Sequence, residues 1–232
     1  MRSEPDGAAE AVAALSDQTR RSLYEYVRAT RRPVTRDECA DATGVSRKLA
    51  AFHLDKLLER GLLRASFARP AGRSGPGAGR PAKRYELSDV EWTVSVPDRR
   101  YDLAGSILAE AVSRCPAGAS PAKTALAVAR ERGHKLGTQW AAVARPRRRG
   151  PGRALDALGK LLESLGYAPG RDGRELTLFN CPFHALVEVD RELVCGLNRE
   201  LLSGVVDGIG EGPMDVRLDP HDGRCCVVVR HD

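Results

Sequence analysis

The sequence predicts an α+β protein made of three consecutive regions. Residues 35–63 show two helical patterns separated by a glycine, and residues 62–87 show two strand patterns around a loop rich in Gly, Pro and Arg. Residues 175–230 combine short apolar strands with a helix, which favours antiparallel strands. We expect an N-terminal domain of helices and a hairpin, central helices, and a small C-terminal α+β domain, at residues 1–98, 99–150 and 151–232.

The N-terminal region opens with a helical segment at residues 8–30. A charged break near Asp17 marks a point where one helix can end and another begin. The apolar residues that recur at helical spacing, and can form the buried stripe, are Val12, Leu15, Leu23, Tyr26 and Val27. We interpret this segment as the first helical part of the domain and as a candidate dimer surface.

The stretch from Thr35 to Leu63 has the pattern of a helix-turn-helix. Thr35 can cap the first helix, and Glu38 three residues later completes a capping box. Gly44 supplies the permissive backbone for the turn, and Ser46 can cap the second helix. The apolar positions of that second helix face a core, which leaves four side chains pointing elsewhere: Arg47, Lys48, His53 and Lys56.

A basic hairpin is expected next, with strands at residues 62–67 and 84–87. The loop between them, RPAGRSGPGAGRPAK, is rich in Gly and Pro, and no acidic residue occurs from Arg60 to Arg84. A wholly basic hairpin beside such a helix suits the phosphate backbone and minor groove of DNA, although a solvated charged loop is the plainer alternative. The candidate DNA contacts are Ser46, Arg47, Lys48, His53, Lys56, Arg80, Lys83 and Arg84.

The composition is that of an ordinary globular protein. The chain has 232 residues, 42% hydrophobic and 29% charged, with a formal net charge of +6. No apolar run approaches the ~20 residues of a membrane span, and the N-terminal segment MRSEPDGAAE lacks the apolar core of a signal peptide. We therefore expect a cytoplasmic protein without a membrane partner, whose cysteines are thiols or metal ligands before they are disulfides.

The central region is expected to be helical. Residues 101–114 and 121–144 have helical periodicity, with a break considered near Gly133 or Gly137, and either helix could be the spine of a homodimer or plain core. The basic segment RPRRRGPG then reads as a turn or linker. A further amphipathic helix follows at residues 154–165 and ends at Gly166.

Cysteines mark the edges of the C-terminal elements. We expect strands at residues 175–180, 214–218 and 224–230, with a helix at 197–206. Cys181 then follows a strand, Cys195 precedes or opens the helix, and Cys225 and Cys226 follow a tight turn. Such positions can converge on one point, and a helix N-terminus favours a thiolate.

This cysteine set has the chemistry of a metal site. Soft thiolate ligands suit zinc or an iron–sulfur cluster. Strand alternation would place Cys225 and Cys226 on opposite faces, so we favour Cys225 and keep Cys226 as the alternate ligand. His184, three residues after Cys181, is a weaker candidate for a fourth ligand. The alternative is that these cysteines are small buried hydrophobes, as we interpret Cys39 and Cys115.

Three segments of the N-terminal part resemble one family. LSDQTRRSLYEYV, VSRKLAAFHLDKLLERGLL and GRPAKRYELS are similar, in order and spacing, to winged helix-turn-helix repressors of the broad ArsR/DeoR type, over residues 10–100. The resemblance implies a transcription repressor that binds double-stranded DNA as a homodimer. Each recognition helix would enter a major groove of an inverted-repeat operator.

The C-terminal part resembles SufR-type regulators of that class. The matching segments are FNCPFHALVEVDRELVCGLNRELLSGVV and GRCCVVV. The resemblance implies a 4Fe–4S cluster on Cys181, Cys195 and a cysteine of GRCC, and a role in sensing redox or iron–sulfur status. No cysteine lies between Cys195 and Cys225, which leaves the fourth iron ligand open. The pattern also resembles ligand-binding domains of the vinyl-reductase type, so a small-molecule pocket stays an alternative, as does zinc.

An enzyme is the third class considered. Cys181 and His184 could act as nucleophile and base. The sequence offers no third orienting group for them and no Gly-rich phosphate loop. We therefore expect a regulator rather than an enzyme.

Overall fold

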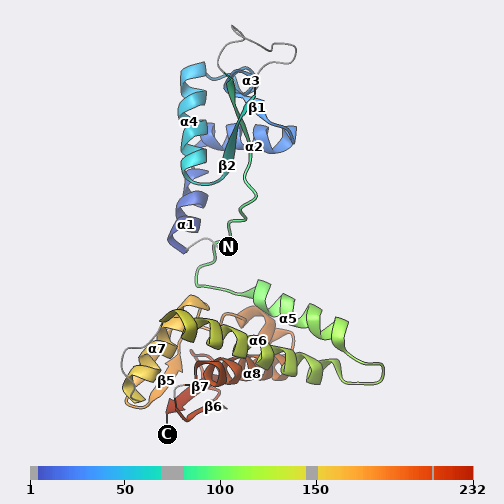
Figure 1. The fold of residues 1–232 in the computed structure, drawn as a ribbon, viewed down its shortest axis with the longest axis vertical. Helices are drawn as coiled ribbons and strands as arrows, with labels where there is room; N and C mark the ends of the chain where they lie inside the picture. The colour runs from blue at the N-terminus through green and yellow to red at the C-terminus, as the bar shows by residue number, and fades with distance from the viewer. Residues whose placement is uncertain (1–4, 69–80, 145–150, 211, 232) are drawn as a thin grey trace. The chain divides into compact units, whose positions relative to one another are not determined.

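The computed structural model describes residues 5–68, 81–144, 151–210 and 212–231. Within them the chain is mixed α+β, with eight α-helices and two small antiparallel sheets, so the predicted class is confirmed at this level. The chain divides into two compact units, residues 1–94 and 95–232 (Figure 1). No helix in the described ranges is long and apolar enough to cross a membrane. Arg80 and the RPRRRG part of the basic segment lie outside these residues.

The first unit packs four helices against a three-stranded sheet. The sheet order is β1–β3–β2, and both pairings are antiparallel. Its core contains Leu23 and Val27 together with the apolar stripe Ala50, Leu54 and Leu57. The elements are α1 (Pro5–Ala14), α2 (Gln18–Thr30), β1 (Val34–Thr35), α3 (Arg36–Thr43), α4 (Arg47–Glu59), β2 (Leu63–Ala68) and β3 (Ala82–Leu87).

Polar caps set the helix boundaries, as predicted. The Thr35 N–H donates to Glu38 Oε2 at 2.7 Å and the Glu38 N–H donates to Thr35 Oγ1 at 3.2 Å, which completes the capping box of α3. Gly44 ends that helix with φ of 70°, and the Ser46 hydroxyl caps α4 by accepting from Leu49 N–H at 3.2 Å. These three local predictions are confirmed.

The buried stripe of α1 differs from the prediction. Val12 is 46% exposed, whereas Ala8, Ala11 and Ala14 are buried. The alanines recur every three residues and so share one face of the helix. This face carries no side chain larger than a methyl group, and a stripe of alanines gives a weaker signal in a sequence than valine does.

The second unit combines helices with a four-stranded antiparallel sheet of order β4–β5–β7–β6. The helices α7 and α8 cover this sheet and share its apolar core, while α5, α6 and the other side of α8 form a second core. The elements are α5 (Tyr101–Arg114), α6 (Pro121–Ala144), α7 (Pro151–Ser164), β4 (Pro169–Asp172), β5 (Glu175–Leu178), the 3₁₀ helix η1 (His184–Glu188), α8 (Arg191–Ile209), β6 (Met214–Leu218) and β7 (Val227–His231).

The helices α6 and α8 lie side by side in backbone contact (Figure 1). A Cβ atom on Gly133 would lie 1.9 Å from the Leu201 carbonyl oxygen, and one on Gly204 would lie 2.0 Å from that of Arg130. Gly137 and Gly208 make similar approaches, at 2.2 and 2.3 Å, one turn further along both helices, so the two helices run parallel. The glycines considered as a break in α6 therefore allow close packing within a continuous helix.

Candidate functional site

The outward face of α4 carries cationic and apolar side chains. Arg47, Lys48, Leu49 and Phe52 are exposed, and Lys56 is half-buried. Leu49 is 40% and Phe52 54% exposed, although both are large apolar residues. Sequence analysis missed these two. Their position in the sequence could have identified them, because neither residue belongs to the buried apolar stripe of α4.

Two of these cations form ion pairs with nearby carboxylates at the surface. The Arg47 guanidinium donates to Asp37 at 2.8 Å, and Lys56 Nζ lies 2.7 Å from Glu59 Oε2. Pairs between solvent-exposed groups contribute only about 0–1 kcal/mol, because water screens both charges. These cations can therefore exchange their carboxylate partners for a more highly charged anion at little cost.

The hairpin meets α4 through Lys83. Its Nζ lies 2.7 Å from Asp55 Oδ1 on α4 and 5.2 Å from the centroid of the Tyr85 ring. The Tyr85 hydroxyl donates to the same Asp55 oxygen at 3.2 Å, and burial followed by the Asp55 charge raises the pKa of Tyr85 to about 12. Arg84 is the next residue along β3 and points to the other sheet face. Only Lys83 of this pair therefore faces α4.

The structure corrects the prediction for His53. This side chain is 6% exposed, and its Nδ1 accepts from Arg20 Nε at 3.4 Å between α2 and α4. His53 lies directly before Leu54 and three residues after Ala50, inside the buried stripe. It therefore belongs to the core of the first unit rather than to its outward face.

Four cysteine side chains meet in the second unit. They lie close enough together that neighbouring thiols shift the pKa values of Cys181, Cys195 and Cys225. All four are free thiols. Cys195 and Cys225 are buried, whereas Cys181 and Cys226 are half-buried. We call this group the thiol chain. It contains every cysteine predicted as a ligand, including both members of the adjacent pair.

Two element boundaries explain why the adjacent pair converges. The strand β7 begins at Val227, so Cys225 and Cys226 lie in the bend before it and strand alternation does not separate them. The helix α8 begins at Arg191 rather than at Leu197, capped by Asp190, so Cys195 lies in its second turn rather than at or before its start. These boundaries correct the predicted strand and helix.

A buried amide holds the middle of the thiol chain. Asn198 is fully buried, and its Nδ2 donates to the Cys225 sulfur at 3.1 Å. The Tyr167 hydroxyl donates to Asn198 Oδ1 from the other side. Burial, and then the nearby Cys225, raises the pKa of Tyr167 well above its usual value. Sequence analysis missed this pair, although Asn198 lies one helical turn after Cys195.

Burial and mutual contact favour the protonated thiols. The neighbouring Cys225 thiol, followed by burial, raises the pKa of Cys181, and burial raises that of Cys195. For Cys225 the contact with Cys181 lowers the pKa, but the contact with Cys226 and burial outweigh it, and the pKa rises to about 11. The expected stabilisation of thiolates by a helix terminus is therefore overridden here. A metal would have to displace these protons.

The donors fit a soft metal in chemistry but not in their present positions. Four sulfurs from three segments are the ligand type that zinc and iron–sulfur clusters take. Among the residues that the structure describes, no group of three or more His, Cys, Asp or Glu side chains is placed to hold a metal ion. His184 is exposed at the start of η1, and its backbone N–H donates to the Cys181 carbonyl at 3.2 Å. Its imidazole is therefore not part of the thiol chain.

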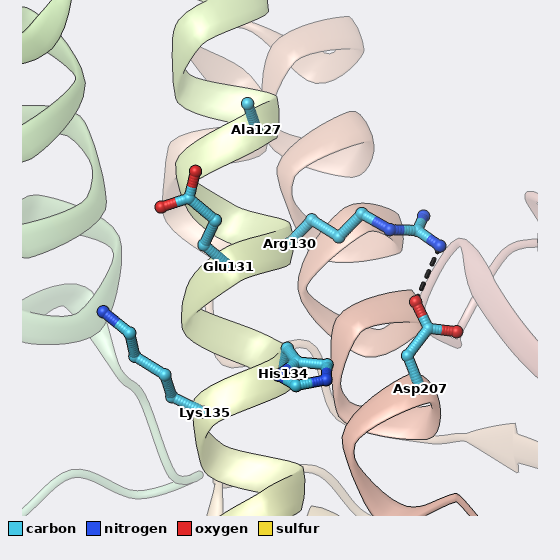
Figure 2. Close-up of a pocket in the computed structure, with 6 residues that line it drawn as sticks. All are labelled: Ala127, Arg130, Glu131, His134, Lys135 and Asp207. Carbon is cyan, nitrogen blue, oxygen red and sulfur yellow. Dashed lines mark hydrogen bonds and ion pairs between the residues drawn. The ribbon is translucent and has the colours of Figure 1, made fainter.

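Two hollows of the second unit bear on the small-molecule alternative. An open depression of about 470 Å³ lies on α6 and α8, and Figure 2 shows Arg130 reaching across it to Asp207, 2.7 Å away. An apolar cavity of about 110 Å³ lies between α5, η1 and α8, lined by Leu108, Phe183 and Leu197 among others. Pockets for drug-sized ligands usually measure roughly 300 Å³ or more. The depression is large enough but open and ion-paired, and the apolar cavity admits only a few heavy atoms.

The chain matches no family model, no curated protein and no solved structure. Its function therefore has to be inferred from the outward face of α4 and from the thiol chain.

Proposed function

We propose that the chain is a DNA-binding transcription regulator of the winged helix-turn-helix class, acting as a homodimeric repressor. In this proposal α4 is the recognition helix and the β2–β3 hairpin is the wing. The observation that carries it is the contact between Lys83 and Asp55 at 2.7 Å, because it joins the hairpin to the exposed face of α4. A cationic helix face continuous with a hairpin has the form expected of a groove-reading surface.

The first turns of α4 are the strongest part of this surface. Arg47 and Lys48 are exposed there beside the Ser46 cap, and recognition helices contact base edges mainly through their N-terminal residues. Leu49 and Phe52 can contact thymine methyl groups. Further along, Asp55 and Glu59 pair with Lys83 and Lys56, which reduces the positive charge of the later turns.

The thiol chain is proposed as the sensor. Cys181, Cys195 and Cys225 would hold an iron–sulfur cluster, with Cys226 as the neighbouring alternative and zinc as the alternative metal. A bound cluster would supply a centre that oxidants and iron shortage can remove. The protein's part is to position the sulfurs, since Asn198 holds Cys225 and the second turn of α8 holds Cys195. Cys195 lies on α8, which packs closely on α6. A structural change at Cys195 would therefore move this pair of helices.

The test of DNA binding starts with selection of operator sequences from random duplexes, followed by affinity measurements at several salt concentrations. Lys48→Ala should weaken binding about tenfold and reduce the slope of log affinity against log salt by about 0.9, the value for one lost phosphate contact. Fluorescence anisotropy with the selected duplex measures both quantities.

Lys160→Ala is the matched control, because Lys160 is exposed on α7 in the other unit. Its affinity and salt slope should equal those of the unsubstituted chain. Equal losses from Lys48→Ala and Lys160→Ala would exclude α4 as the binding surface. A folded chain that enriches no sequence would overturn the proposed function.

A further inference from the structure

We propose that the loop Asn180–Pro182 controls operator affinity by holding the segment Asp98–Arg100, through which the chain enters the second unit. Because operator affinity is its readout, this control rests on the proposed DNA binding, but it requires no bound metal. Asn180 is the positioning residue that joins Cys181, a cysteine of the proposed sensor, to that segment. We call the loop and the segment together the connector clamp.

Two backbone carbonyls of the loop accept hydrogen bonds from the segment. The Arg99 guanidinium donates to the Cys181 carbonyl at 3.2 Å, and the Arg100 N–H donates to the Pro182 carbonyl at 2.9 Å. Pro182 is buried and Cys181 is half-buried. Consecutive residues of the segment therefore contact consecutive residues of the loop, so a displacement of the Cys181 backbone disturbs both contacts.

Asn180 uses its whole amide group in the same clamp. Its Nδ2 donates to the Asp98 carbonyl at 2.8 Å and to the Gly166 carbonyl at 2.6 Å. Its Oδ1 accepts from the Arg99 guanidinium. One side chain therefore joins the loop to the segment and to the turn that follows α7. Alanine at this position would leave all three of these groups without their partner.

Gly166 allows the three parts to pack at one point. Its φ is 86°, in the left-handed region that favours glycine. A Cβ atom there would lie 3.3 Å from Asp98 Cβ, 3.4 Å from Arg100 Cγ and 3.6 Å from Pro182 Cβ. The segment, the loop and the turn after α7 are therefore in close contact, and none of them can shift without moving the others.

The connection between the units is also anchored at its other end, within the first unit. Trp92 packs on the core of that unit, and its Nε1 donates to the Gly61 carbonyl at 3.3 Å. Residues 93–97 lie between the two anchors, and four of them are exposed. A short connection held at both ends transmits a displacement that a long flexible linker would absorb. A change at Cys181 can reach the DNA-reading unit by this route.

A held connection favours operator binding because it limits the positions available to each DNA-reading unit. A homodimer on an inverted repeat has to present both recognition helices at the spacing of the half-sites. When the clamp is released, each unit samples more positions, and ordering them on DNA costs affinity. The same freedom lets the dimer accept half-sites at other spacings. Lower affinity together with wider spacing tolerance is the expected signature of a released clamp.

The experiment compares Asn180→Ala with Asp190→Ala in the full chain. Asp190 caps α8 by accepting from Leu193 N–H at 3.0 Å, so its removal destabilises the second unit outside the clamp. Asn180→Ala should weaken binding to the selected operator about tenfold, within the usual range of coupling between sites, whereas Asp190→Ala should not weaken it. Two base pairs inserted between the half-sites should cost the unsubstituted chain more affinity than they cost Asn180→Ala.

Hydrogen exchange shows whether the clamp has opened in a chain that is otherwise folded. The Arg100 amide donates within the clamp and should exchange about tenfold faster in Asn180→Ala. The Cys225 amide donates to a carbonyl of β5 at 2.8 Å and should keep its protection. In Asp190→Ala the ratio of these two exchange rates should equal that of the unsubstituted chain.

Arg99→Ala provides a second variant, because it removes the donor to the Cys181 carbonyl and to Asn180 Oδ1. The chain with both Arg99→Ala and Asn180→Ala should bind the operator about as weakly as either single variant, since both release one contact.

Three results would overturn control by the clamp while leaving the proposed regulator intact. They are unchanged affinity and spacing tolerance in Asn180→Ala, equal losses of affinity in Asn180→Ala and Asp190→Ala, and an Arg100 amide that stays as protected as before. An unsubstituted chain that enriches no operator would instead refute the regulator itself.

Discussion

Asn198 shows how one polar residue organises a buried site. It is fully enclosed in α8, yet both ends of its amide are used, by the Cys225 sulfur and by the Tyr167 hydroxyl. A buried amide without partners would cost roughly 1–3 kcal/mol, so this arrangement specifies where the bend before β7 must lie. The position of Cys225 therefore depends on a side chain that sequence analysis did not select.

Glu38 makes the stability of the first unit depend on pH. The Thr35 N–H and then the Arg32 guanidinium lower its pKa from 4.5 to about 2 in the folded state. The folded-state pKa lies below the ordinary one, so the carboxylate stabilises the fold fully above about pH 4.5, and this stabilisation is lost as pH falls toward 2. Glu38→Gln should therefore flatten the decrease in unfolding free energy between about pH 4.5 and pH 2.

Urea unfolding followed by Trp92 fluorescence, in a Trp140→Phe background, measures this effect, because Trp92 packs on the first unit. Glu25→Gln is the control, since Glu25 is exposed on α2. It should leave the pH profile as steep as that of the unsubstituted chain. A Glu38→Gln profile equally steep would show that the capping box does not carry the acid response.

Some elements could be placed from the sequence alone. The expected bounds of α5, α6 and β6 agree with the structure residue for residue. These elements are predicted by local patterns in the sequence, namely apolar periodicity, prolines near helix ends and short alternating runs. The caps at Thr35 and Ser46 were equally local. On the outward face of α4, the three cations Arg47, Lys48 and Lys56 could be named, but the burial of His53 depended on how α2 crosses α4.

Other elements depend on partners that are distant in the chain. The strand β1 contains only Val34 and Thr35 and exists through its pairing with β3. The strand β4 contains a proline and a glycine, which are poor strand formers, and it is held at the sheet edge by β5. The convergence of Cys225 and Cys226 likewise required the true start of β7. Local patterns could not supply these tertiary constraints.

The glycine contact between α6 and α8 is the element most sensitive to substitution. Gly133→Ala places a methyl group 1.9 Å from the Leu201 carbonyl oxygen, so the helices must separate. We expect a loss of about 3 kcal/mol in the free energy of unfolding of the second unit, an overpacking penalty at the upper end of the usual range. Urea unfolding followed by Trp140 fluorescence in a Trp92→Phe background provides the measurement.

Gly105→Ala is the matched control on α5. A Cβ atom there meets no described atom within 4 Å, so alanine should stabilise the helix by about 0.5–1 kcal/mol. Opposite signs for the two substitutions would identify close packing as the reason for Gly133. A Gly133→Ala chain as stable as the unsubstituted one would contradict the described contact.

The whole molecule joins a proposed DNA-reading unit to a proposed sensing unit, and metal content tests that division. The chain should be purified without oxygen, with iron, sulfide and zinc quantified per chain and an absorption spectrum recorded. Matching iron and sulfide with broad visible absorption are expected for a cluster. Simultaneous substitution of Cys181, Cys195 and Cys225 by Ser should abolish them, whereas Cys115→Ser should not.

Three other results would change the sensor proposal. Zinc alone, at about one per chain, would replace the cluster by a structural or zinc-sensing site. Full iron content in the triple variant would refute the ligand assignment. A metal-free chain after reconstitution would favour the ligand-pocket alternative. Operator binding by the first unit is tested separately, so each of these results leaves that part of the proposal intact.

Because Cys225 is enclosed, the rate at which its thiol is labelled reports how often this part of the second unit opens. A bulky alkylating reagent reaches that sulfur only when the bend before β7 leaves β5, because the thiol is 2% exposed. Cys115 is partly exposed at the end of α5 and reacts from the closed state. When reclosing is faster than labelling, the labelling rate of Cys225 is proportional to the fraction of time that the site spends open, and labelling of Cys115 is the reference for the closed state. The same chain therefore contains both the reporter thiol, Cys225, and the reference thiol, Cys115. Local opening of this region can be measured without DNA, metal or dye.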